Sequence, residues 1–144
     1  MEVSTMSGTT SPILENKVSF FLETAGLAQE FVSDILISIQ TMNQFEGHSE
    51  YHRNNDIMKL TRQVSQFVEL TTLLSKAVMQ FKKKTMNDFK SSHIHLLFVM
   101  KAMNQAQLKG DSVALEELIK YELKDNLTQW KIDLIPQTKR LLNS

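Results

Sequence analysis

The strongest constraint on the fold of this 144-residue chain is a repeat of mainly apolar residues that follow one another at alternating steps of three and four residues. We call the positions of this repeat a seam. This spacing keeps one side of an α-helix against a partner helix. The repeat occurs in two long stretches. The first contains Leu14, Val18, Phe21, Ala25, Ala28, Val32, Ile35, Ile39 and Met42. The second contains Ile57, Leu60, Val64, Phe67, Thr71, Leu74, Val78 and Phe81. Two long helices that pack on one another are therefore expected.

The whole pattern predicts an all-α protein, an antiparallel four-helix bundle. Residues 1–11 are small and polar and are predicted to form a disordered tail, and residues 12–144 a single helical-bundle domain. We expect helices over residues 12–43, 55–83, 87–109 and 111–135, with a loose last turn over 139–142.

Capping residues set the expected ends of these helices. Ser11 and Pro12 are typical of an N-cap followed by the first helical residue. Gly110 and Asp111 indicate a helix stop followed by a new N-cap. Pro136 has no backbone N–H, so the last helix is expected to end or kink near Ile135. The segment 44–55, which contains Gly47, is expected to form the first turn.

Composition excludes several classes of protein. The chain has no Cys, which removes disulfides, thiolate metal sites and cysteine nucleophiles. Its start has neither a basic segment nor an apolar segment typical of a signal peptide. No stretch approaches the ~18 apolar residues of a membrane span. A cytoplasmic protein is expected.

The net charge of zero hides an asymmetry along the chain. Residues 1–50 hold seven acidic residues and one basic residue, whereas residues 51–101 hold nine basic and three acidic residues. One interpretation is that the first helix pairs with the second, complementary in charge at the edges of the seam. The other is that the molecule has two opposite charged faces, each open to a partner.

The predicted third helix is apolar over much of its circumference. Such a helix is either central in a bundle or has a second face that meets another chain. Methionine is common at surfaces that adapt to varied partners. The predicted partner-binding residues, from this helix and the one after it, are Phe98, Met100, Met103, Tyr121, Glu122 and Trp130.

Two residues near this region carry ionisable side chains at apolar positions. His93 falls on the stripe that contains Phe89 and Leu96, so a partly buried histidine that bonds to a neighbouring helix is expected. Glu122 lies between Ile119 and Leu123 and is expected to be partly buried and paired with a lysine or with His93.

Other chemistry is sparsely represented. His48, Glu50 and His52, together with His93, form the best metal candidate and define one alternative, a metal-dependent bundle enzyme. A second alternative is an anion-binding or nucleic-acid-binding module built on Arg62, Lys82–Lys84, Lys90 and Lys101. The neutral charge of the chain argues against a nucleic-acid reader, which is usually basic overall. The preferred prediction has no catalytic, metal or cofactor-binding residue.

The stretch from Asp111 to Trp130 resembles a motif, approximately D-x-V-x-L-x-D-L-x-x-Y-E-L-x-P-x-L-x-x-W, of small, largely uncharacterised helical proteins of Gram-positive bacteria. The chain has Glu117 and Asp125 where that motif commonly has Asp and Pro. The residues kept are Asp111, Val113, Leu115, Leu118, Tyr121, Glu122, Leu123, Leu127 and Trp130. The last helix is also similar to that of flagellin export chaperones, four-helix bundles that wrap the helical tail of a secreted subunit.

These observations together predict a non-enzymatic helical module for protein–protein interaction. It would act as a chaperone, adaptor or assembly factor, and the resemblance implies a role in motility or secretion. The expected partner is another helical protein or a second copy of the chain in a homodimer. The expected setting is the bacterial cytoplasm.

Overall fold

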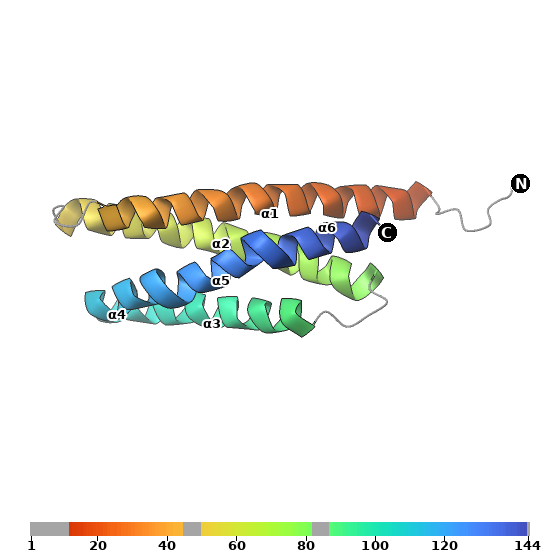
Figure 1. Cartoon of the computed structure of the whole chain (residues 1–144). Helices are drawn as coiled ribbons and strands as arrows, with labels where there is room; N and C mark the ends of the chain where they lie inside the picture. Colours follow the sequence, from red (N-terminus) through yellow and green to blue (C-terminus); the bar gives the residue numbers. More distant parts are fainter. Residues whose placement is uncertain (1–11, 45–49, 82–86, 144) are drawn as a thin grey trace, which may run out of the picture.

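The computed structural model describes residues 12–44, 50–81 and 87–143, and it describes side chains over 16–42, 53–80 and 87–143. It confirms the all-α, antiparallel four-helix bundle, with no strand in the described ranges (Figure 1). The first three helices are α1 (Pro12–Gln44), α2 (Glu50–Phe81) and α3 (Asn87–Lys109). The fourth, here called the C-terminal helix, is continuous through α4 (Ser112–Glu117), η1 (Leu118–Leu123), α5 (Lys124–Gln129), η2 (Trp130–Leu134) and α6 (Ile135–Asn143).

The C-terminal helix crosses the bundle diagonally. Helices α1 and α2 form a long antiparallel pair, as the seam spacing predicts. The start of the C-terminal helix packs on α3, and its end packs on α1 and α2. Because of this crossing, α1 and α3 lie at opposite edges of the molecule (Figure 1).

Burial of the two seams confirms their assignment. Every described seam position from Phe21 to Ile39 and from Ile57 to Val78 is buried, while Val18 and Met42 at the ends of the first seam are half-buried. Leu14 and Phe81 lie outside the described side chains. Thr71 is buried in the second seam because its hydroxyl donates to the carbonyl of Val68 at 2.9 Å, which satisfies its polar group locally.

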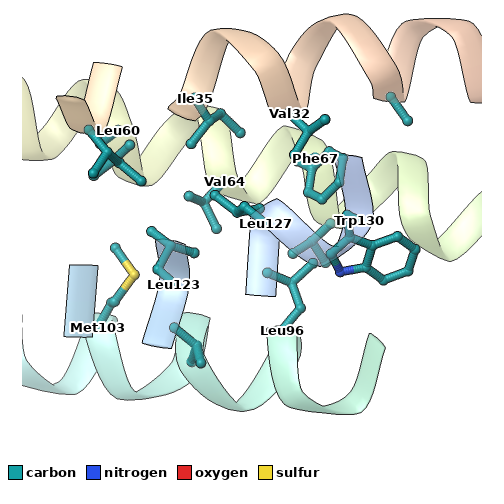
Figure 2. Close-up of a cluster of buried hydrophobic side chains, with 14 of the residues drawn as sticks. Val32, Ile35, Leu60, Val64, Phe67, Leu96, Met103, Leu123, Leu127 and Trp130 are labelled. Carbon is teal, nitrogen blue, oxygen red and sulfur yellow. The ribbon is translucent and has the colours of Figure 1, made fainter. Parts of the chain in front are cut away.

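The core centres on Trp130, which is 0% exposed. Its ring meets Phe89 edge-on with centroids 4.9 Å apart and Phe67 edge-on with centroids 5.9 Å apart. The same core cluster contains side chains from all four helices, among them Val32, Val64, Leu96 and Leu127 (Figure 2). The indole therefore joins the N-terminal pair of helices to the C-terminal pair.

The corner between α3 and α4 has the predicted caps. Gly110 has φ +66°, a left-handed conformation that glycine adopts without steric cost. The Asp111 carboxylate accepts a hydrogen bond from the Ala114 N–H at 3.1 Å, which confirms the N-cap. The predicted first turn is too long, since α2 begins at Glu50 and residues 50–55 are helical. The first helical residues of α2 are polar and do not belong to the apolar repeat, so the sequence did not distinguish them from a loop.

The helix does not end near Ile135, one of the two outcomes predicted for Pro136, because α6 continues through this residue. The π-helical turn η2 precedes the proline, and in it the Ile135 N–H bonds to the Trp130 carbonyl, five residues back. In the same five-residue pattern, the backbone N–H of residue 136 would donate to the Lys131 carbonyl, but proline has no N–H. The side-chain amide of Gln29 in α1 supplies the missing donor, with Nε2 3.2 Å from the Lys131 carbonyl oxygen.

The two π-helical turns explain the spacing of buried residues in the C-terminal helix. The buried rows Leu115–Ile119–Leu123–Leu127 and Trp130–Leu134–Thr138–Leu142 advance in steps of four. A regular α-helix has 3.6 residues per turn, so such rows rotate away from a fixed partner. The wider turns at η1 and η2 offset this rotation and keep both rows in the core.

Candidate partner-binding surface

Helix α3 is not central in the bundle. Its buried side carries Phe89, Leu96, Val99 and Met103, among others. Its other side exposes Ile94, Leu97 and Phe98, with Phe98 63% exposed. The sequence interpretation of a second apolar face is therefore the one that the structure supports.

The six predicted partner-binding residues divide into three groups. Phe98 and Tyr121 are exposed at 63% and 64%, and the Glu122 side chain is 49% exposed. Met100 is half-buried and packs against the core. Met103 and Trp130 are 1% and 0% exposed, so they are core residues and cannot touch a partner of the folded protein. The prediction is wrong for these two because helical spacing alone does not show which apolar face turns inward.

A groove lies between α3 and the start of the C-terminal helix. Its volume is about 470 Å³, and its lining includes Ala102, Gln105, Tyr121 and Glu122. Phe98 precedes Ala102 by one helical turn and therefore continues the same side of α3. We call Phe98, Ala102, Gln105, Tyr121 and Glu122 the Phe98–Tyr121 surface.

Polar contacts brace one end of this surface. His95 Nε2 lies 3.8 Å from Glu122 Oε1, so Glu122 is exposed and faces His95. The sequence had suggested a partly buried Glu122 paired with a lysine or with His93. The buried Asn126 amide donates to the Ser92 carbonyl oxygen at 3.1 Å and lies 3.1 Å from His95 Nδ1. These contacts hold α3 at a fixed position against η1 and α5.

Sequence reasoning missed His95 and Asn126 as members of this cluster. A signal for Asn126 was present, because this amide lies four residues from both Glu122 and Trp130 on the buried side of the helix. A polar residue at such a position requires a hydrogen-bonding partner. The partner comes from α3, a choice that only tertiary packing makes.

His93 is half-buried, as predicted, and serves packing. Its Nε2 lies 3.5 Å from the Thr72 hydroxyl of α2, and its ring centroid is 6.4 Å from that of Trp130. Burial lowers the pKa of His93 below its ordinary value of 6.5 because the cation loses solvation. This environment therefore favours the neutral form of His93.

A second groove, of about 690 Å³, lies at the end of the bundle near Gly110. It is bordered by the start of α2, with Arg53 and Met58, and by the start of α4, with Asp111 and Glu116. An ion pair between Arg53 and Glu116 joins its two sides. Its lining mixes charges with apolar groups, and no residue of the predicted partner-binding set borders it.

The residues behind the two alternative functions are only partly described. His48 and Lys82–Lys84 lie outside the described residues, as do the side chains of Glu50 and His52. Among the described side chains, no three of the types His, Cys, Asp or Glu gather as a metal ion would require. Arg62, Lys90 and Lys101 are exposed. None of the described helices combines the length and apolar character needed to cross a membrane.

The fold and this surface define a helical-bundle protein with exposed aromatic side chains beside a groove. A family model described as outer membrane lipoprotein carrier protein LolA-like matches residues 23–144, more than half of the chain. The chain therefore belongs to this family. Neither the comparison with curated proteins nor that with solved structures gives a match.

Proposed function

We propose that the protein is a non-enzymatic carrier that binds a segment of another protein at the Phe98–Tyr121 surface. The observation that carries this proposal is the exposure of two aromatic side chains, Phe98 and Tyr121, beside a groove of about 470 Å³. Exposed aromatic residues next to a hollow are typical anchors of protein interfaces. The buried hydrogen bond from Asn126 to the Ser92 carbonyl oxygen joins the two helices that form the surface, which favours a surface formed before a partner arrives.

The family supports a carrier in general terms, since its description names a lipoprotein carrier. The kind of cargo is part of the proposal. An apolar, preferably helical segment fits a surface formed by two neighbouring helices, the arrangement in which amphipathic helices are commonly bound. The resemblance to flagellin export chaperones leads to the same class of function, a protein that escorts another protein.

The cellular setting is also part of the proposal. The sequence interpretation places the carrier in the bacterial cytoplasm, whereas the family description names outer membrane lipoproteins. Fractionation of the native host, followed by immunodetection of the protein, separates these settings. Recovery outside the cytoplasm would remove the cytoplasmic part of the proposal and leave the surface unaffected.

The surface is tested by crosslinking in native cells with a matched pair of variants. Phe98→Gln removes an aromatic side chain that is 63% exposed, and the control Phe20→Gln removes one that is 50% exposed on α1. Both variants should keep the helical circular dichroism of the wild type. We expect wild type and Phe20→Gln to recover the same stoichiometric partner and Phe98→Gln to lose it. Equal recovery by all three proteins would refute the proposed surface.

A further inference from the structure

The outer face of α3 carries a short basic stripe that the cargo-binding proposal does not use. It consists of Lys90, Ile94, Leu97 and Lys101, at spacings of four, seven and eleven residues from the first. This spacing places all four on one side of a helix. All four are exposed, with Ile94 at 57% and Leu97 at 38%. Two apolar side chains therefore lie between two lysines on an open helix face.

The outer face of α1 carries an acidic stripe with the same spacing. It consists of Glu23, Leu27, Glu30 and Asp34, again at four, seven and eleven residues from the first. All four are exposed, with Leu27 at 49%. Eleven residues of α-helix extend about 16 Å, so the charges at the two ends of each stripe are equally far apart.

The two stripes carry opposite charges at both ends, and each has an exposed apolar side chain between them. Laid side by side in either direction, they bring Glu23 and Asp34 next to the two lysines and place Leu27 next to Ile94 or Leu97. Glu30 lies next to the other of these two apolar residues. The charges are available, since Lys90 and Lys101 form no ion pair with any described side chain, and the same holds for Glu23 and Asp34. Complementary charges of this kind steer association and fix its register.

The two stripes of one molecule cannot meet each other. Helices α1 and α3 lie at opposite edges of the bundle (Figure 1), and the residues of both stripes are exposed. A contact between two different surfaces is heterologous, so each copy can bind one neighbour through α1 and another through α3. Such contacts produce a ring or an open chain of copies, not a twofold dimer.

We propose that copies of this chain associate head to tail, the acidic stripe of α1 in one copy docking on the basic stripe of α3 in the next. This goes beyond the carrier function, because the stripe lies on the outer face of α3 and the Phe98–Tyr121 surface lies on its flank. It also uses the second interpretation of the charge asymmetry, in which two opposite faces each meet a charged partner.

Charge reversal provides the test on the purified full-length chain. Lys90→Glu with Lys101→Glu makes both stripes acidic, and Glu23→Lys with Asp34→Lys gives the α1 stripe two lysines against Glu30, so that both stripes are net basic. Each double variant alone should associate at least about tenfold more weakly than wild type, because attraction becomes repulsion at both ends of the contact. The control Lys76→Glu with Lys124→Glu makes the same change in net charge at exposed positions outside the stripes and should associate like wild type.

Mixing the two stripe variants should restore association, because each then meets a stripe of opposite charge on the other. Sedimentation velocity in about 0.15 M salt is the measurement, since charges beyond about 8 Å are screened there and net charge alone attracts weakly. Wild type should form species larger than a dimer as its concentration rises, and high salt should dissociate them. A wild type that stays monomeric, a mixture that stays monomeric, or variants that associate like wild type would each overturn the proposal.

The outcomes are independent of the carrier function. A monomeric chain that still loses its partner on Phe98→Gln would refute head-to-tail association and leave the carrier proposal intact. If mixing the two stripe variants restores association, and Phe98→Gln recovers the partner as well as wild type does, head-to-tail association stands and the carrier proposal is refuted. Recovery of an unrelated acidic helical protein on the α3 stripe of a monomeric chain would replace the second copy as its occupant.

Discussion

Replacement of Trp130 should show how much the bundle depends on a single side chain. Trp130 is 0% exposed and contacts aromatic rings from α2 and α3 at right angles. Burying an aromatic side chain removes about 150–250 Å² from water, which at about 25 cal/mol per Å² stabilises by about 4–6 kcal/mol. The edge-to-face contacts add about 0.5–1.5 kcal/mol each.

The indole N–H of Trp130 offsets part of this stabilisation. The indole Nε1 is buried and no described group accepts its hydrogen bond, which costs about 1–3 kcal/mol. Trp130→Ala should therefore lower the free energy of unfolding by about 3–5 kcal/mol, the range for such truncations in a core. Trp130→Phe keeps an aromatic ring but buries less area, which destabilises, and it removes the unpaired N–H, which stabilises. These two effects should nearly cancel, so the free energy of unfolding should fall by less than about 1.5 kcal/mol.

Urea denaturation followed by circular dichroism measures both variants, since the only Trp of the chain is lost in each and fluorescence cannot be compared. The slope of the transition should stay constant, which would show that the exposed area on unfolding is unchanged. A loss below about 1 kcal/mol for Trp130→Ala, or equal losses for the two variants, would contradict the packing argument.

Two further predictions concern the backbone and the pH dependence. Gln29→Ala should destabilise the protein by about 0.5–1 kcal/mol in urea denaturation, because the Lys131 carbonyl loses its donor. In a Pro136→Ala background, where the backbone N–H returns, the same change should cost less; additive losses in this double-mutant cycle would disprove the compensation. The lowered pKa of His93 means that the unfolded chain takes up a proton before the folded protein does. Stability should therefore fall as the pH drops through 6.5, and His93→Gln should flatten this part of the profile of unfolding midpoints; an unchanged slope would show that His93 does not cause it.

The site was partly visible in the sequence. Phe98 and Tyr121 were predicted and are exposed. Phe98 was visible because the third helix has more apolar residues than one seam can bury, and Tyr121 because it belongs to the motif of the next helix. The motif from Asp111 to Trp130 was less informative about binding than it looked. Its residues Leu115, Leu123, Leu127 and Trp130 form core, whereas Val113, Tyr121 and Glu122 are exposed. A shared motif can therefore reflect packing as much as recognition.

The steps of four between apolar residues of the C-terminal helix are also visible in the sequence, and they indicate turns wider than those of an α-helix. A regular helix cannot keep Leu115, Ile119, Leu123 and Leu127 on one side without a wider turn. The same reasoning applies to the row that begins at Trp130. The continuation through Pro136 could not be predicted, because the donor that replaces its N–H comes from Gln29, more than a hundred residues away.

By itself, the sequence determined the elements of this protein. The seam spacing specified the first two helices and their buried sides, and Gly110 and Asp111 specified the corner before the last helix, because periodicity and capping act within a few residues of the chain. Tertiary structure alone decided that Trp130 is core, that Glu122 meets His95, and that the acidic and basic faces lie at opposite edges. Those outcomes depend on how the C-terminal helix crosses its neighbours, a choice set by the packing of side chains that are distant in sequence.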